Sequence, residues 1–235
     1  MQVLRNLLAD LEKMKNPAKA KVLAGFFKTG KGEYGEGGIF WGITVPRQRV
    51  VAQKYFQKIS FADLRYLLKQ SVHELRFSAI VALVMKYQKG DAKEKERVAK
   101  FYLKNLKGIN NWDLVDLSAP QILGDYLFKR DKVVLYGLAR SKNLWERRIA
   151  MLSTFGFIKR NDFRDALKIA EILLFDKHDL IHKAVGWMLR EVGKRNKEVE
   201  IDFLDKYAMR MPRTALRYAI EKFFQREREK YLKMC

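Results

Sequence analysis

The segment Glu74–Gln88 reads ELRFSAIVALVMKYQ, and its apolar residues recur at intervals of three and four. This spacing is typical of an α-helix, because residues three and four apart share one face, whereas a half-buried strand alternates apolar and polar residues. Most segments between the four prolines of the chain show the same spacing. We therefore predict an all-α protein made of consecutive helices.

The same spacing predicts the other helices and leaves one long loop. Seven of the 14 glycines fall between Gly25 and Gly42, which indicates a loop over Thr29–Val45. A loop of this length in a compact helical protein is usually functional. The remaining helices are expected at Val3–Met14, Ala18–Lys28, Arg47–Lys58, Phe61–Lys69, Lys93–Leu106, Trp112–Leu127, Lys132–Arg140, Leu144–Lys159, Phe163–Phe175, Leu180–Lys194, Glu198–Met209 and Arg213–Lys233.

The helices also repeat along the chain. The segment beginning at Arg76 (RFSA) aligns with those at Arg148 (RIAM) and Lys183 (KAVG), at separations of 72 and 35 residues. These separations are close to two and one units of a ~36-residue helical-pair repeat, and one unit before Arg148 falls on Trp112. We therefore expect these four residues in equivalent places along one wall of a solenoid. The alternative is that they are ordinary solvated ends of buried helices.

The charge of the chain indicates a polyanionic partner. Lysine and arginine number 48 against 27 acidic residues, which gives a net charge of +21 and an isoelectric point near 10.0. The positive side chains in such an excess repel one another. Binding to a phosphate backbone offsets this repulsion and is favoured by the release of counterions condensed on the backbone. The rival partner, an anionic membrane surface, needs an anchor. We find no signal peptide or membrane-spanning segment in the sequence.

The length of the chain and its cysteine content indicate its domain number and its cellular setting. A chain of 235 residues can bury its own core, so we expect residues 1–235 to form one domain. Cys235 is the only cysteine, which excludes an internal disulfide and a thiolate-rich metal site. We therefore expect a protein of a reducing, cytoplasmic setting.

One pair of side chains suggests a catalytic site. Trp112 and Asp116 are four residues apart, so on a helix an indole stands beside a carboxylate. Trp187 follows Lys183 by four residues on the same repeat face, and Arg148 belongs to the repeat between the two tryptophans. Two aromatic walls, one acid and one guanidinium suit a sugar that develops positive charge.

A single acid limits which glycosidic bond could be broken. A typical glycosidase needs a second carboxyl group to protonate its leaving group. A purine alkylated at a ring nitrogen is already cationic and leaves as a neutral base, so it needs no proton donor. The alternative is that Trp112 and Trp187 are core aromatics and that Asp116 caps or pairs locally.

These residues resemble the AlkD family of DNA alkylation-repair glycosylases. The similarity spans nearly the whole chain and is carried by GEGGIFWGITVP (35–46), NWDLVD (111–116), WERR (145–148) and KAVGWMLRE (183–191). Gly38 departs from the pattern, since relatives often have aspartate after the preceding glycine. The resemblance implies a right-handed α-α superhelix of HEAT-like repeats with a basic concave face. It also implies that N3- and N7-alkylpurines are excised from duplex DNA without flipping of the base.

The resemblance assigns roles to individual residues. It implies that Asp116 is the catalytic carboxylate, that Trp112 and Trp187 cradle the deoxyribose of the lesion, and that Arg148 supports the DNA backbone and the acid. It also implies that Thr44 and Arg49 lie against DNA at the start of a helix. The remaining candidate DNA contacts are Arg76, Lys183 and Arg190.

The expected activity is that of a monofunctional glycosylase acting as a monomer, with double-stranded DNA as partner and with no cofactor or metal. The alternative is a non-catalytic HEAT-repeat protein that binds damaged or branched DNA.

Two further motifs are weak signals of function. Gly30–Gly35 spells a dinucleotide fingerprint but follows a helical pattern instead of a strand. His178 and His182 are spaced as metal ligands can be, but a turn and a helix start explain them as well.

Overall fold

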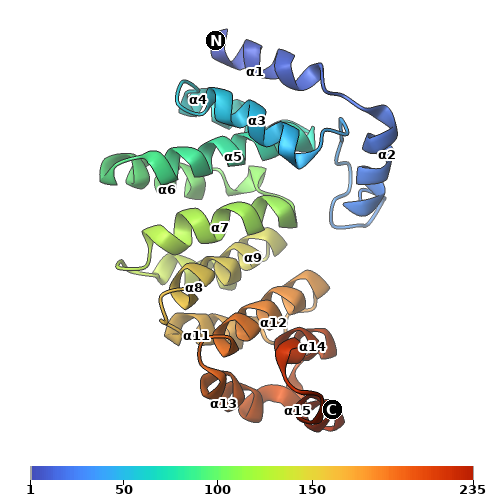
Figure 1. Ribbon diagram of the computed structural model, residues 1–235, viewed down its shortest axis with the longest axis vertical. Helices are drawn as coiled ribbons and strands as arrows, with labels where there is room; N and C mark the ends of the chain where they lie inside the picture. Colours follow the sequence, from blue (N-terminus) through green and yellow to red (C-terminus); the bar gives the residue numbers. More distant parts are fainter. Residues whose placement is uncertain (1, 235) are drawn as a thin grey trace. The chain divides into compact units, whose positions relative to one another are not determined.

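The computed structural model describes residues 2–234, and regular structure in this part of the chain is helical (Figure 1). The only strand-like pairing among these residues is an isolated bridge between Ile39 and Val72. The predicted all-α class is therefore confirmed, and the consecutive helices are consistent with an α-α solenoid of repeats. Cys235, on which the prediction of a reducing setting rested, lies outside the described residues.

The chain divides into two compact units, Met1–Ser118 and Ala119–Cys235. The prediction of one domain over residues 1–235 stays a prediction, and each unit is described by itself. The helices of the first unit are α1 (Gln2–Glu12), α2 (Pro17–Phe26), α3 (Val45–Tyr55), α4 (Phe61–Leu68), α5 (His73–Lys89), α6 (Ala92–Lys104) and the start of α7 (Trp112–Tyr126).

Helix α5 is the centre of the first unit. It packs against α3, α4 and α6, and α3 in turn packs against α1. Every residue of α5 from His73 to Val84 is buried. A helix that is buried on all sides needs apolar residues on every face along most of its length, which explains why Glu74–Gln88 has so long an apolar centre. Helix α2 and the loop that follows it lie beside the first turns of α3 and α5 (Figure 1).

The second unit is built around α12 (Asp179–Gly193), which packs against α9, α11, α13 and α14. Helix α7 enters this unit beside α10, where Gly124 and Gly156 meet so closely that a Cβ on Gly156 would collide with the backbone of Gly124. The other helices are α8 (Val133–Ala139), α9 (Leu144–Ser153), α10 (Phe155–Ile158), α11 (Arg164–Leu173), α13 (Lys197–Tyr207), α14 (Arg213–Ala219) and α15 (Gln225–Lys233).

Two predicted helices are wrong as single elements. Leu144–Lys159 divides into α9 and α10 at Thr154, whose hydroxyl donates to the Met151 carbonyl at 2.6 Å. Arg213–Lys233 divides into α14 and α15, because Phe223 and Phe224 are extended. Phe223 is buried while Phe224 is 80% exposed. Tertiary packing therefore overrides a helical pattern in both segments.

The predicted repeat register is wrong at Trp112. Arg148 and Lys183 are both the fifth residue of their helices, α9 and α12, and Arg76 is the fourth residue of α5. Trp112 is instead the first residue of α7, and Asp116 is the fifth. A difference of four residues exceeds the ordinary uncertainty of helix ends. Counted from the helix starts, the acid and not the indole corresponds to Arg148 and Lys183.

A buried carboxyl group in the second unit makes the stability of the protein depend on pH. Glu200 of α13 is 2% exposed, and its Oε1 has no hydrogen-bond partner among the described residues. Burial raises its pKa to about 8, although the charges of Lys197 and Arg190 act in the opposite direction. The folded protein therefore keeps this proton at pH values where the unfolded chain has lost it.

We expect the free energy of unfolding to fall as the pH rises from about 4.5 to about 8, by no more than about 5 kcal/mol from this group. Glu200→Gln, a neutral side chain of the same shape, should lose this part of the pH dependence and be more stable than the wild type at pH 8. Urea unfolding at pH 5, 6.5 and 8 measures both effects. If the free energy of unfolding changed with pH equally in the two proteins, Glu200 would not be the source of the pH dependence.

Candidate functional site

Trp112 and Asp116 lie one turn apart on α7, as the sequence predicted, and both are partly exposed. The Trp112 amide is held by the Asn111 side chain, which accepts its N–H at 2.8 Å. Behind the acid, the buried Tyr102 hydroxyl lies 2.9 Å from the Ser118 hydroxyl. Burial raises the pKa of Tyr102, and the negative charge of Asp116 adds to the rise. Asp116 thus acts electrostatically on its surroundings within the first unit.

An aromatic cluster supports Trp112. Its ring stacks on Phe27, with centroids 5.2 Å apart and 20° between the planes. Phe26 meets it edge-on at 5.8 Å and is itself 60% exposed. Phe27 stacks in turn on Phe40 at 5.1 Å and lies 4.9 Å from the His73 ring. Trp112 is therefore not fully buried in the core. It is the partly exposed outer member of an aromatic stack whose other rings, Phe27 and Phe40, are buried.

This cluster was not predicted from the sequence. Its one available signal was the pair Phe26-Phe27 immediately before the glycine-rich loop, because a helix that ends in two aromatic residues presents at least one of them outside the core. Phe40 lies in the predicted loop, outside any helical pattern, so periodicity could not place it beside Phe27.

The loop of residues 27–44 is held by one buried carboxylate. Glu74 is 0% exposed, and its oxygens accept the backbone N–H groups of Trp41, Gly42 and Ile43 at 2.8 to 3.2 Å. Gly42 has a φ of +79°, and a Cβ there would collide with the Asn16 carbonyl oxygen. The loop is thus fixed by long-range contacts, and it delivers the chain to the start of α3.

Thr44 and Arg49 lie at the beginning of α3, where the sequence predicted them. Thr44 is the N-cap residue, but its side chain makes no capping hydrogen bond. Arg47 and Arg49 are exposed, and neither forms an ion pair with any described residue. A helix N-terminus with unsatisfied N–H groups and nearby guanidinium groups suits a phosphate.

Arg76 has a different environment from the one the repeat suggested. It is 6% exposed, and its Nη1 donates to the carbonyls of Gln70 and Ser71 at 2.6 and 2.9 Å. Burial lowers its pKa, while the charges of Asp113 and Glu74 act in the opposite direction. In this structure Arg76 ties the end of α4 to α5, and a DNA contact by this residue stays a prediction.

In the second unit, Arg148 is 5% exposed and links α9 to α12. Its Nη1 donates to the Leu180 carbonyl at 2.5 Å. Trp187 lies two turns further along α12 than Leu180, is partly exposed and contacts Phe155 at 6.1 Å between ring centroids. The structure therefore brings Arg148 to the helix that carries Trp187. Convergence of these two with Trp112 and Asp116 stays a prediction.

The other two basic candidates of this unit are both paired. Lys183 Nζ lies 2.7 Å from Asp179, one turn earlier on α12. Arg190 pairs with Glu221, and its side chain is only 16% exposed. Lys183 is accessible at 39% of its side chain, so it is the more available of the two for a phosphate.

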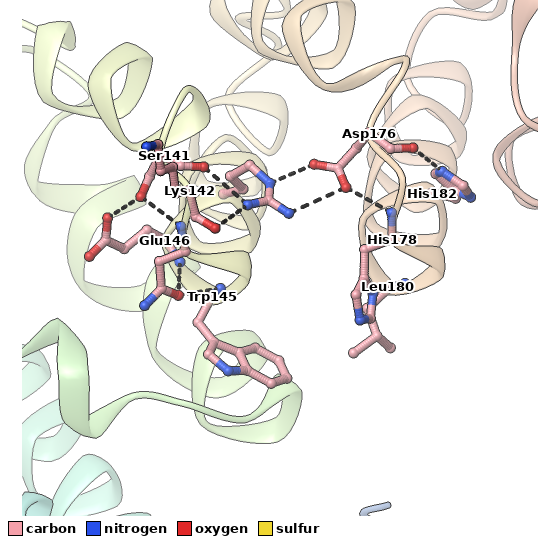
Figure 2. Close-up of polar contacts among 10 residues, drawn as sticks. Ser141, Lys142, Trp145, Glu146, Asp176, His178, Leu180 and His182 are labelled. Carbon is pink, nitrogen blue, oxygen red and sulfur yellow. Dashed lines mark hydrogen bonds and ion pairs between the residues drawn. The ribbon is translucent and has the colours of Figure 1, made fainter. Parts of the chain in front are cut away.

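A polar network holds the first turns of α9 and α12 together (Figure 2). Arg147 donates to the carbonyls of Ser141 and Lys142 at 3.0 Å and forms an ion pair with Asp176 at 2.5 Å. Asp176 also accepts the His178 amide at 2.9 Å. This network fixes the two loops that precede the helices of Arg148 and Trp187.

The two histidines that had suggested a metal belong to the same network. His178 Nδ1 accepts the Leu180 amide and so caps α12, and burial lowers the pKa of His178, which favours the neutral ring. His182 Nε2 lies 2.5 Å from the Asp176 carbonyl oxygen. Within residues 2–234, no three histidine, cysteine or acidic side chains are grouped as metal ligands, and no helix is long and apolar enough to cross a membrane.

Comparison with known proteins agrees with this architecture. A predicted DNA alkylation repair enzyme from Enterococcus faecalis superimposes with a TM-score of 0.69 at 17% identity, covering 90% of this chain and 98% of that one. The crystal structure of smu.31 from Streptococcus mutans UA159 gives a TM-score of 0.54 at 17% identity, covering 77% and 92%. At this identity the two structures establish a shared fold. No match is found among curated proteins.

The family comparison covers most of the sequence. The model of the family described as DNA alkylation repair enzyme matches residues 7–223, which include Trp112, Asp116, Trp187 and the loop. The resemblance noted in the sequence is therefore confirmed at the level of the family. This chain belongs to the DNA alkylation repair enzyme family.

Proposed function

We propose that the protein is a monofunctional DNA glycosylase that excises N3- and N7-alkylated purines from duplex DNA. The observation that carries the proposal is the pair on α7: a partly exposed Trp112 stacked on Phe27, with Asp116 one turn away on the same face. The family assigns DNA repair, and this pair supplies the groups that a developing sugar cation requires.

The reaction follows from the charge of the substrate. The bond between C1′ and the ring nitrogen breaks, and its electron pair neutralises the cationic purine, which departs without a proton. The sugar becomes an oxocarbenium-like cation, which the Asp116 carboxylate stabilises. Water then adds to C1′ and loses a proton, so that the products are an abasic site and a neutral base. In this proposal no base is flipped and no cofactor takes part.

Binding to duplex DNA depends on the basic residues of both units. Thr44 and Arg49 would receive a phosphate at the start of α3, where the uncapped helix and exposed guanidinium groups favour an anion. Lys183 and Arg148 would contribute from α12 and α9, with Arg190 in a lesser role because it already pairs with Glu221. We propose that the protein acts on DNA as a monomer.

The proposed function is tested by base release. The wild type should liberate 3-methyladenine or 7-methylguanine from a methylated duplex, leave abasic sites and show no strand cleavage before alkali treatment. Unmethylated duplex of the same sequence is the control. Tight, salt-sensitive binding to both duplexes without any base release would instead establish the non-catalytic DNA-binding protein that the charge of +21 alone also explains.

We expect Arg49→Gln to weaken binding to methylated and unmethylated duplex equally, because a phosphate contact carries no sequence or lesion information. The slope of log K against log salt should fall by about 1. Fluorescence anisotropy between 50 and 300 mM salt measures both. Arg97→Gln, which removes a charge already paired with Glu94 at 2.8 Å, is the matched control for net charge. A selective loss for methylated DNA would assign Arg49 to the lesion instead.

A further inference from the structure

Four rings and one carboxylate of the first unit form a closed circuit of contacts that begins and ends at the start of α7. Trp112 stacks on Phe27 with centroids 5.2 Å apart, and Phe27 stacks on Phe40 at 5.1 Å. Phe40 stacks on the His73 ring at 4.8 Å, and His73 Nε2 lies 2.8 Å from Asp113 Oδ2. Asp113 is the residue after Trp112, so the circuit closes on the backbone of α7.

The circuit determines which side of the Trp112 indole a ligand can reach. Phe27 covers one face of the indole, with 20° between the two ring planes. Phe26 meets the indole at 71° between the planes, and its centroid lies only 5.1 Å from that of Phe27, so the two phenyl rings pack together beside the indole. Trp112 is nevertheless partly exposed, which leaves the side away from Phe27 for the sugar of the proposed substrate.

The space behind the stack is open instead of close-packed. Phe27, Phe40, His73 and Asp113 all line a cavity of about 290 Å³ whose walls are almost wholly apolar. Rings that border empty space lack packing partners on that side, so their positions depend on the stack itself. Removal of one ring would therefore leave its neighbours free to turn toward the cavity.

The inner part of the circuit is fixed by backbone hydrogen bonds on both sides of Phe40. The following residue, Trp41, donates its N–H to the buried Glu74 carboxylate at 3.0 Å. The preceding residue, Ile39, accepts the backbone N–H of His73 at 2.8 Å. Phe40 is thus a fixed surface on which the rest of the stack is built.

We propose that Phe27 is a positioning residue for the reaction, because it fixes the plane of the Trp112 indole so that the free side stands against the deoxyribose. Asp116, one turn along α7, then faces the same sugar. The inference rests on the proposed function. Phe27 is 7% exposed, so it acts through Trp112 and not by its own contact with DNA.

Substitution of Phe27 tests this role. Phe27→Leu removes the flat ring and keeps an apolar side chain. It should release 3-methyladenine from methylated duplex about 10- to 100-fold more slowly than the wild type in single turnover, with duplex affinity within about twofold, since no phosphate contact is lost. Phe27→Tyr keeps the ring and should release the base within about threefold of the wild-type rate.

Phe77→Leu is the matched control. Phe77 is 4% exposed, lines the same cavity and contacts the His73 ring at 6.4 Å between centroids. The same substitution there perturbs the same cavity and leaves the stack of Phe27 on Trp112 in place. Both leucine variants should lower the melting temperature by about 5 °C, but only Phe27→Leu should slow base release.

The position of the indole is read independently of activity. The chain has four tryptophans, so labelling with 5-fluorotryptophan gives four ¹⁹F signals, and Trp112→Phe identifies the one from Trp112. Loss of the stacked ring should move this signal in Phe27→Leu and not in Phe77→Leu. An unmoved Trp112 signal in Phe27→Leu, or equal slowing of base release by the two leucine variants, would overturn the proposal.

The two measurements keep this inference separate from the proposed function. Absence of base release by the wild type would end the proposed function and, with it, any role of Phe27 in the reaction; the fluorine signal would then show only whether the ring orients the indole. Base release by Phe27→Leu at the wild-type rate would end the positioning role alone and leave the proposed glycosylase standing.

Discussion

Asp116→Asn is expected to release alkylated bases at least about 100-fold more slowly than the wild type, while it binds methylated duplex with unchanged or higher affinity. The amide keeps the size of the carboxyl group but carries no charge to oppose the sugar cation. Single-turnover release of 3-methyladenine or 7-methylguanine, with enzyme in excess, isolates the chemical step from product release.

Asp125→Asn is the matched control on the same helix. Asp125 also lies on α7 but pairs with Arg160 at the surface, so its loss should leave the release rate within about twofold of the wild type. Thermal unfolding of both variants checks that the fold persists. Equal rates for Asp116→Asn and the wild type would remove Asp116 from the mechanism.

Glu74→Gln is expected to lower stability by roughly 2–4 kcal/mol, and the melting temperature by about 5–15 °C. The carboxylate is fully buried and accepts the amides of Trp41, Gly42 and Ile43. The glutamine NH₂ group would face one of these donors, which leaves a buried N–H unsatisfied. Thermal unfolding followed by circular dichroism measures the change.

The loop itself provides the control for this variant. Glu33 accepts the Gly30 amide at 2.8 Å on the exposed side of the loop, so Glu33→Gln should change the melting temperature by no more than a degree or two. Equal effects of the two substitutions would show that Glu74 does not hold the loop. Because the loop leads to Thr44, Glu74→Gln should also weaken DNA binding at temperatures where the protein is still folded.

Local spacing was sufficient for most of the helices and for one half of the proposed site. Trp112 and Asp116 share a face because they are four residues apart, and a helix fixes that relation by itself. The predicted ends of α4 and α5 are within one residue of the observed ones for the same reason. The repeat was less informative. Counting back from Arg148 by a fixed period of 36 residues reaches Trp112, whereas counting from the starts of the helices makes Asp116 the residue that corresponds to Arg148.

Contacts between distant segments decided what periodicity could not. Arg76 satisfies the pattern of a basic wall, yet it is buried against the carbonyls of Gln70 and Ser71. Arg148 is held by Leu180, 32 residues later in the chain. A sequence pattern reports which face a side chain occupies, but not which backbone oxygen lies within reach of a guanidinium group.

By itself, the sequence determined the all-α class, the charge of +21 that favours a nucleic acid, and the indole-carboxylate pair on α7, since each follows from composition or from neighbours within one helical turn. Only the tertiary structure decided that Glu74 holds the loop, that Phe27 stacks on Trp112, and that His73 pairs with Asp113. These features join residues 31 or more positions apart, and only packing against a common core brings such residues together.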